Sequence, residues 1–176
     1  MDIAEGTPDP LLDEKAMLIA FLEEQRKVMF RKVSGDLSQE QLTQRLVPSE
    51  TTLLGLVKHL IDVEAGWFRI VMAGEDDVPR SYGPDDPDGD FRVGVDETRE
   101  SLLARYEEEI VRSDAIIARY DLDDTTTRAT RIDPVEDPPK VPVTLRWILL
   151  HMIEETARHA GHADILREQL DGATGI

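Results

Sequence analysis

The sequence predicts an all-α fold, a four-helix bundle with two long connections. Four stretches of roughly twenty to twenty-seven residues repeat apolar side chains at helical spacing. Residues 74–95 and 121–143, which separate the last three of these stretches, are rich in proline and acidic residues, as loops are, and the first of them also holds four glycines. No segment shows a convincing β-strand alternation, so helices packed on helices are the expected architecture. A chain of 176 residues is expected to form a single domain over residues 1–176.

The first helix is predicted over residues 11–32. One helical stripe there carries apolar residues at spacings of seven, four and seven: Leu11, Leu18, Leu22 and Met29. Two prolines, at positions 8 and 10, stand where such a helix would start. The following segment, "SGDLSQEQL", combines turn-forming residues with room for one short helix.

The second helix is predicted over residues 50–73, in "ETTLLGLVKHLIDVEAGWFRIVMAG". Ser49 or Thr51 is the expected N-cap, because a side-chain oxygen there accepts a hydrogen bond from the first turn, and Gly74 is the expected stop. Residues 74–95 hold three prolines, four glycines and seven acidic side chains, which indicates a loop rather than a second core.

The third helix is predicted from Asp96, as its N-cap, to about Tyr120. The fourth is predicted from Thr144, as its N-cap, to about Leu170, just before an Asp-Gly pair that ends it. Residues 121–143 connect the two helices. Their stiff part is "DPVEDPP", with at most a short extended piece around "VPV".

The composition excludes several classes of function. Asp and Glu number 37 against 20 Lys and Arg, and the net charge of −17 repels phosphate backbones and anionic membranes. Neither nucleic acid nor a membrane is therefore an expected partner. The chain has no cysteine, which excludes disulfides, thiolate metal sites and a cysteine nucleophile. Its apolar runs are too short to span a bilayer and its N-terminus is acidic where a signal peptide is basic, so a cytoplasmic location is expected.

Three of the four histidines lie in "HMIEETARHAGH", residues 151–162 of the fourth helix. They are His151, His159 and His162. At about 100° per residue, all three fall within about 40° of Glu155. The same face carries apolar side chains, so this polar stripe is expected to point into the core.

Glu155 and His159 are one helical turn apart, a spacing that lets two side chains of one helix bind a single metal ion. A buried carboxylate without a partner costs several kcal/mol, so these grouped polar residues need a common counterpart, which a divalent cation supplies. Glu154 and Arg158 fall outside the stripe and are expected to reach solvent. The competing interpretation pairs Glu155 with an arginine across the bundle and makes His151 a partly exposed residue on the helix shoulder.

The fourth histidine, His59, lies on a small and apolar face of the second helix and is expected to point inward. Gly55 and Gly66 flank it at one and two turns, and each glycine costs about 1 kcal/mol in a helix. They leave room either for a cavity beside His59 or for close packing of helices. Asp62 is either an acceptor for an imidazole N–H or a plain surface charge. A satisfied core histidine is the alternative to a ligand.

His59, Glu155 and His159 therefore converge from two helices as a candidate metal site. The two stretches that carry them, "LVKHLIDVEAGWF" and "IEETARHAGHADILRE", resemble the DinB-like superfamily of metal-binding four-helix bundles, which includes bacillithiol transferases and mycothiol-dependent enzymes. The resemblance covers most of the chain, from about Leu11 to Gly172. In that pattern a histidine of the second helix joins two ligands spaced i, i+4 on the last helix.

The second stretch is similar to the branch associated with mycothiol S-transferases. Members with three histidine ligands carry histidine where this chain has Glu155, whereas mycothiol-dependent maleylpyruvate isomerases use glutamate followed four residues later by histidine. The order His59, Glu155, His159 therefore favours mycothiol. His162 stands where other members often carry glutamine, which implies that it faces the open side of the metal.

Two imidazoles and one carboxylate leave a zinc ion with an open position, as catalytic sites do; nickel or iron are the other candidates. The expected activity is a detoxifying transfer of a low-molecular-weight thiol to a small electrophile, with His162 receiving the thiol proton or orienting a bound water. A zinc-dependent hydrolase and a noncatalytic metal-containing binding or stress-response module are the alternatives. The resemblance also implies a homodimer, for which Trp67, Phe68 and Val71 offer a contact unless they belong to the core.

Overall fold

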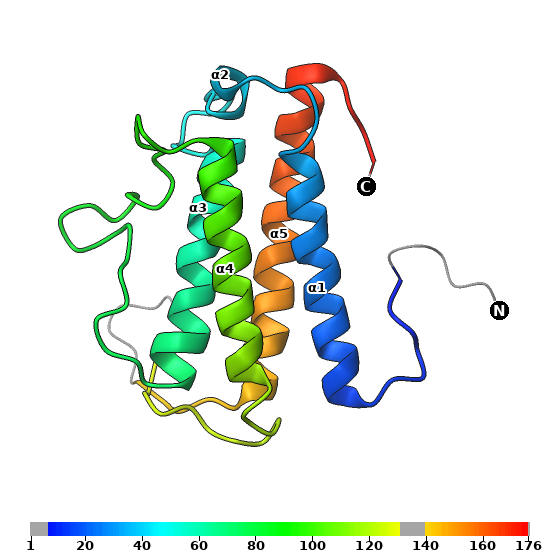
Figure 1. Cartoon of the computed structure of the whole chain (residues 1–176), viewed down its shortest axis with the longest axis vertical. Coiled ribbons are helices and arrows are strands. Elements are labelled where there is room, and N and C mark those ends of the chain that lie inside the picture. Colours follow the sequence, from blue (N-terminus) through cyan, green and yellow to red (C-terminus); the bar gives the residue numbers. More distant parts are fainter. Residues whose placement is uncertain (1–6, 131–139, 176) are drawn as a thin grey trace.

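A computed structural model describes residues 7–130 and 140–175 of the chain. Four long helical segments lie side by side (Figure 1), as a four-helix bundle requires, and the predicted all-α class is confirmed. In the described ranges, extended pairing is limited to isolated β-bridges. The helices are α1 (Glu14–Lys32), α2 (Gln39–Leu42), α3 (Leu53–Glu64), the π-helix η1 (Ala65–Met72), α4 (Arg99–Ile117) and α5 (Leu145–Asp171).

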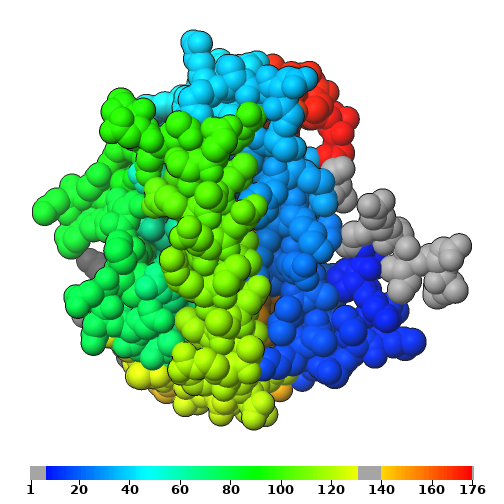
Figure 2. Space-filling view, viewed as in Figure 1, coloured from blue at the N-terminus to red at the C-terminus, as the bar shows by residue number. Residues whose placement is uncertain are grey.

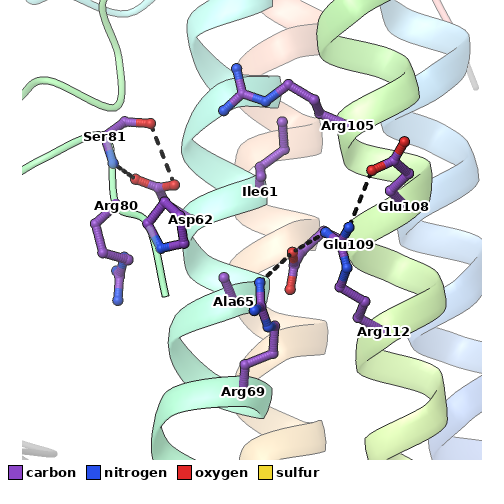
Figure 3. A pocket seen from close by; sticks show the side chains of 11 residues that line it. Ile61, Asp62, Ala65, Arg69, Arg80, Ser81, Arg105, Glu108, Glu109 and Arg112 are labelled. Carbon is purple, nitrogen blue, oxygen red and sulfur yellow. Dashed lines mark hydrogen bonds and ion pairs between the residues drawn. The ribbon is translucent and has the colours of Figure 1, made fainter. Parts of the chain in front are cut away.

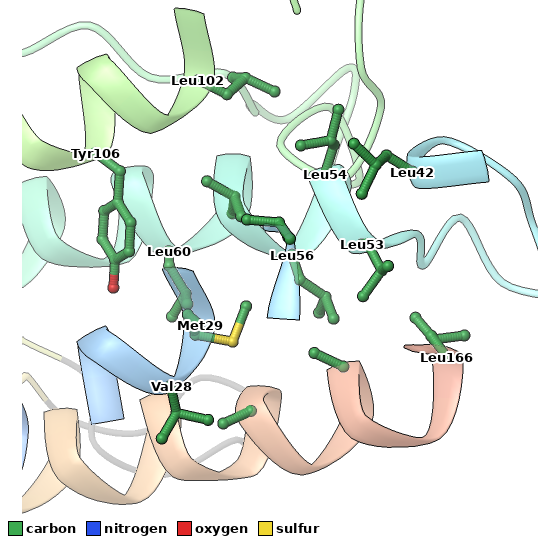
Figure 4. Packing of buried hydrophobic residues seen from close by; sticks show 14 of the residues in the cluster. Val28, Met29, Leu42, Leu53, Leu54, Leu56, Leu60, Leu102, Tyr106 and Leu166 are labelled. Atoms are coloured by element: carbon green, nitrogen blue, oxygen red, sulfur yellow. The ribbon is translucent and has the colours of Figure 1, made fainter. Parts of the chain in front are cut away.

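The helices enclose an apolar core from several directions. The closest pairings are α1 against α5 and α3 against α4, and α3 also packs on α5. One cluster joins Met29 of α1, Leu56 of α3, Tyr106 of α4 and Leu166 of α5 (Figure 4). A second cluster lies toward the η1 end of the molecule and includes Phe68, which is fully buried. The site described below is therefore anchored on rigid, well-packed helices.

The first helix begins later than the sequence predicts. Asp13 is the N-cap of α1, its carboxylate accepts a hydrogen bond from the Ala16 amide, and the helix starts at Glu14. Leu11 precedes the helix and is 91% exposed, so its assignment to the apolar stripe is wrong. The short helix expected next is confirmed as α2, where Ser38 and Gln41 form a capping box.

The second predicted helix is α3 continued by η1. Thr52 is the N-cap, where the sequence predicts Ser49 or Thr51, because its hydroxyl lies within reach of the Gly55 amide. The last eight residues follow a π-helical path, which a search for 3.6-residue periodicity does not distinguish from an α-helix. Gly74 has a positive φ of 75° and ends the helix as predicted.

The third helix is capped by Thr98, so the prediction of Asp96 is wrong. Thr98 and Ser101 form a reciprocal capping box, which satisfies two backbone amides at once. The helix ends at Ile117, before the predicted end at Tyr120. The fourth helix is as predicted at its start, where Thr144 caps α5. It extends to Asp171, and Gly172 follows it in the left-handed conformation.

The connection between η1 and α4 lies along the flank of α3, to the left in Figure 1. Figure 2 shows α4, in green, and α1, in blue, side by side on the face that is turned to the viewer. In the second connection, Val141 pairs with Thr130 and Val143 with Thr126, so a short extended piece is present where "VPV" predicts one. The "DPVEDPP" segment lies outside the described residues.

A buried ion pair that no sequence pattern predicts links three helices. Arg26 of α1 donates two hydrogen bonds of 2.7 Å to Glu64 at the end of α3, and both side chains are almost fully buried. It also donates to Asp114 of α4 at 2.9 Å. These charges fix how α1, α3 and α4 meet beside the site. None of the described helices is long and apolar enough to cross a membrane.

Candidate functional site

The site lies where α3 and α5 pack together. Thr52 starts α3 and the buried side chains of Leu56 and Leu60 fix its rotation, which leaves His59 facing α5 with a side chain that is 16% exposed. On α5, Met152 and Thr156 are buried in the same way and direct Glu155 toward α3. The fold therefore brings together residues that are 96 positions apart in the chain.

Three predicted residues meet at this point. Nε2 of His159 lies 3.1 Å from Oε1 of Glu155, and Nε2 of His59 lies 3.5 Å from the same oxygen. One ligand atom from each residue lies within 4.8 Å of the others, so this group could hold a metal ion. The two imidazole rings are 4.8 Å apart and meet edge to face. The convergence of His59, Glu155 and His159 that the sequence predicts is present.

Two of the three separations are close to those between ligands of a small divalent cation. Two nitrogen or oxygen ligands about 2.0–2.1 Å from one tetrahedral ion lie about 3.3–3.4 Å from each other, and the values here are 3.1 and 3.5 Å, while all three ligand atoms lie within 4.8 Å of one another. The Nδ1–H of His59 donates a hydrogen bond to Oδ2 of Asp90, so in the neutral ring Nε2 presents a lone pair to a carboxylate oxygen of Glu155. Two acceptors that face each other need a positive charge between them, either a proton or a metal ion.

The pKa values of His59 and Glu155 are both shifted by the contacts between these groups. Burial opposes the charged imidazole, but hydrogen bonds to Glu155 and Asp90 outweigh it and raise the pKa of His59. Hydrogen bonds from His159 and His59 lower the pKa of Glu155 far below its usual range. Glu155 is therefore an anion at neutral pH and carries the charge that a cation requires.

Arg158 holds the second oxygen of Glu155. Its Nη1 donates to Oε2 at 2.6 Å, which leaves Oε1 free to face the histidines. The sequence predicts that Arg158 and Glu154 reach solvent, and both side chains do so, at 49% and 66% exposure. The alternative of an arginine across the bundle is wrong, because the partner lies one turn away on the same helix.

Asp90, in the connection between η1 and α4, is the residue that sequence reasoning missed. Its Oδ2 accepts the Nδ1 proton of His59 at 2.7 Å, and the neighbouring Phe91 ring stacks on the imidazole at 4.4 Å. Asp62, the acceptor considered from the sequence, instead accepts from the Ser81 amide at 2.6 Å, so that assignment is wrong. Asp90 is one of seven acidic residues in its loop, and nothing in the sequence separates it from the others.

The two glycines near His59 make room for neighbouring groups rather than for a cavity. A Cβ on Gly55 would lie 2.4 Å from the carbonyl oxygen of Phe91, so the loop backbone packs directly against this residue. A Cβ on Gly66 would meet only the guanidinium of Arg80, at 3.0 Å. Neither the expected cavity nor the expected close packing of helices is found at these glycines, because the groups that approach them come from the loop between η1 and α4.

The two outer histidines have different surroundings. His162 is exposed, so the expectation that the whole histidine stripe points into the core is wrong for this residue. Its ring lies 5.4 Å from that of His159, next to the site. His151 is half buried, as a shoulder residue would be, and stacks on Trp147 at 5.1 Å with its edge contacting Trp67 at 4.7 Å. Burial lowers the pKa of His151, which favours a neutral ring at neutral pH. His151 therefore belongs to an aromatic cluster.

A separate pocket of about 540 Å³ lies between α3, α4 and residues 79–81 (Figure 3). Its charged side chains pair mainly with one another: Glu109 accepts from both Arg69 and Arg112, at 3.2 Å each. Asp62 is bound to Ser81, and burial raises its pKa. The residues that line the pocket include no histidine, so the His59 site remains the better candidate for chemistry.

The comparisons with known proteins agree with this geometry. No curated protein matches the chain. The sequence model of the Mycothiol-S-transferase family matches residues 17–172, which include all the residues of the His/Glu/His group and both helices that carry them. The predicted resemblance is confirmed, and the chain belongs to the Mycothiol-S-transferase family.

Proposed function

We propose that the protein is a metal-dependent S-transferase that joins a low-molecular-weight thiol, mycothiol in the first place, to a small electrophile. The single observation that carries the proposal is the convergence of two imidazole nitrogens and one carboxylate oxygen from α3 and α5. Family membership supplies the thiol class. A cytoplasmic location and a single domain stay predictions.

His59, Glu155 and His159 would hold the metal ion, with zinc favoured and nickel or iron as substitutes. When bound, the ion lowers the pKa of a coordinated thiol and stabilises the thiolate. The donor set supports this assignment, since three protein ligands leave a fourth position open to substrate. Arg158 occupies Oε2 of Glu155, so Oε1 is the oxygen that would hold the ion.

His162 is proposed to receive the thiol proton. It is exposed one turn beyond His159, where a substrate could reach both. The sulfur then forms a bond to the electrophilic carbon, and the leaving group departs with its bonding electrons. If the acceptor is an addition substrate, His162 returns the proton to the product instead.

The activity test uses a fluorogenic electrophile such as monochlorobimane with a panel of thiols. We expect the zinc-loaded protein to consume the electrophile only when a thiol is added, with mycothiol preferred. Hydrolysis of ester or amide probes without any thiol would instead support a hydrolase. Metal binding with neither reaction would support a noncatalytic module.

A homodimer is proposed from family membership alone. Of the three apolar residues considered for its interface, Phe68 is a buried core residue, and Trp67 is partly buried and packs on Trp147. Val71 is partly buried in the same cluster. Sedimentation equilibrium at micromolar concentration should give twice the chain mass of 19.8 kDa, and a purely monomeric species would exclude the dimer.

A further inference from the structure

We propose that Asp90 is the positioning residue of the metal centre: it holds His59 in the tautomer whose Nε2 lone pair faces Glu155 and His159. This inference rests on the proposed metal site and adds to it a residue outside the helices. A carboxylate that accepts the second N–H of a metal-binding imidazole fixes both the tautomer and the ring orientation.

The burial of Asp90 supports this role. The residue is 3% exposed, and its Oδ2 lies 2.7 Å from Nδ1 of His59. Among the residues that the structure describes, its other oxygen has no hydrogen-bond partner. A buried carboxylate with so few contacts is costly unless positive charge lies nearby. A cation on the far side of His59 supplies such charge through the imidazole.

Phe91 constrains the same imidazole from its face. Its ring stacks on His59 with centroids 4.4 Å apart and planes inclined by 19°. Asp90 fixes one edge of the ring while Phe91 fixes its plane, so two consecutive loop residues define the direction of Nε2. The remaining freedom of the His59 side chain is thereby small.

Gly55 allows the loop to come this close. It lies one helical turn before His59, and a Cβ there would be 2.4 Å from the carbonyl oxygen of Phe91. Any side chain at this position would push the backbone of residues 90 and 91 away from α3. The glycine that the sequence places beside His59 is therefore part of the same arrangement.

His159 has no comparable support in the described residues, where its buried Nδ1 lacks a partner. The two histidines thus differ in how firmly they are held. Loss of Asp90 should affect the one imidazole that the loop orients, while the Glu155 and His159 pair on α5 stays in place.

The first experiment measures the zinc dissociation constant by competition with a chromophoric chelator. We expect Asp90→Asn and Asp90→Ala to bind zinc about 10–100-fold more weakly than the wild type. Gly55→Ala should weaken binding in the same direction, because its Cβ would meet the Phe91 carbonyl oxygen at 2.4 Å and the N-cap hydroxyl of Thr52 at 2.9 Å. The matched controls are Asp88→Asn, an exposed carboxylate in the same loop, and Gly66→Ala, where only the end of a flexible arginine is met. Both should keep the wild-type constant.

A second readout follows the Nδ1 proton itself. In the cobalt(II)-loaded protein this exchangeable proton should give a hyperfine-shifted NMR signal that disappears in D₂O. We expect the signal to be lost by fast exchange in Asp90→Ala and to persist in Asp88→Asn. A purely structural role for Asp90 would lower the melting temperature of the metal-free protein without this spectroscopic change.

The outcomes separate the two proposals. If both Asp90 variants bind zinc like the wild type while His59→Ala loses it, the role of Asp90 is overturned and the proposed metal site stands. If the wild type itself binds no zinc, both are overturned. Should the Asp90 variants fail to fold, Gly55→Ala against Gly66→Ala decides, and equal affinity in these two overturns the inference.

Discussion

Nε2 of His159 lies 3.1 Å from Oε1 of Glu155, one helical turn earlier on α5. The same carboxylate gives its other oxygen to Arg158. The two carboxylate oxygens of Glu155 therefore have different partners: Oε2 accepts a hydrogen bond from Arg158, and Oε1 faces both histidines. This arrangement makes Glu155 the centre of the site and the most informative residue to change.

Glu155→Ala should abolish metal binding and transferase activity together. The substitution removes the ligand that both imidazoles face, and it leaves His159 without its partner on α5. Elemental analysis should find about one zinc, nickel or iron ion per wild-type chain purified without chelators or a histidine tag. Glu154→Ala, one residue earlier and exposed, is the matched control and should keep the ion. Full metal retention by Glu155→Ala would remove it from the site.

His162→Gln should keep the fold and the metal but slow thiol transfer by roughly 10²-fold, the usual effect of losing a general acid or base. The residue is exposed and is not part of the His/Glu/His group. Metal content and transfer rate are measured on the same preparation. If the variant loses metal as thoroughly as Glu155→Ala, then His162 is a ligand and the open-position mechanism is wrong.

His151→Gln should lower the free energy of unfolding by about 1 kcal/mol, because the substitution removes an aromatic ring that contacts Trp147 and Trp67. Metal content and thiol transfer should not change. Denaturant unfolding of the metal-free protein measures the first effect. An unchanged midpoint would show that the aromatic contacts contribute nothing to stability, and a loss of metal would place His151 in the site.

The sequence predicts the helices of the site well and its loop partner poorly. Thr144 and Gly172 mark the ends of α5 because each is determined by local interactions. The Thr144 side chain accepts a hydrogen bond from the first turn, and Gly172 adopts the left-handed conformation that ends the helix. Helical periodicity places Glu155 and His159 on the inward face of α5 and His59 on that of α3, but it also places His151 and His162 on the same face as Glu155. Asp90 has no such signal, because a loop has no periodicity and its docking depends on tertiary contacts with Gly55.

The N-cap of the third helix shows the same limit of prediction from local sequence. Asp96 and Thr98 are both good N-cap residues, and only the reciprocal bond with Ser101 selects Thr98. The sequence likewise does not predict the pairing of Arg26 with Glu64. Each charged residue is of a kind that is common on helix surfaces, and the two come together only when α1 packs against α3. Long-range packing decides these cases.

Glu64→Gln should destabilise the protein by about 3–5 kcal/mol, because it leaves the buried guanidinium of Arg26 without its main counter-charge. The double variant Arg26→Met/Glu64→Leu should recover much of this loss, since no buried charge remains. Lys27→Ala, which breaks an exposed pair with Glu23, should change stability by less than about 1 kcal/mol. If Glu64→Gln lowered the free energy of unfolding by no more than Lys27→Ala does, the pair of Arg26 and Glu64 would contribute little to stability.

The stability of the metal-free protein should decrease as the pH rises from 5.5 to 8, whereas the stabilisation that zinc adds should increase. Without metal, the raised pKa of His59 contributes stability that is complete below its unfolded value of 6.5 and is lost as the pH rises through the folded value. The lowered pKa of Glu155 contributes stability above 4.5, which is lost only as the pH falls through its folded value. Both contributions are present together between about pH 5 and 6.

Thermal melts at pH 5.5 and 8 test this expectation. The metal-free wild type should melt at a lower temperature at pH 8, and the decrease should shrink in His59→Gln, which has no imidazole to titrate at that position. Zinc should stabilise the protein more at pH 8 than at pH 5.5, because the metal binds only deprotonated ligands. The chain has only four histidines, and Asp62, whose pKa burial raises, is present in both proteins, so the comparison with His59→Gln isolates the contribution of His59. An equal decrease in the wild type and His59→Gln would show that His59 does not carry the charge that the geometry of the metal-free site demands.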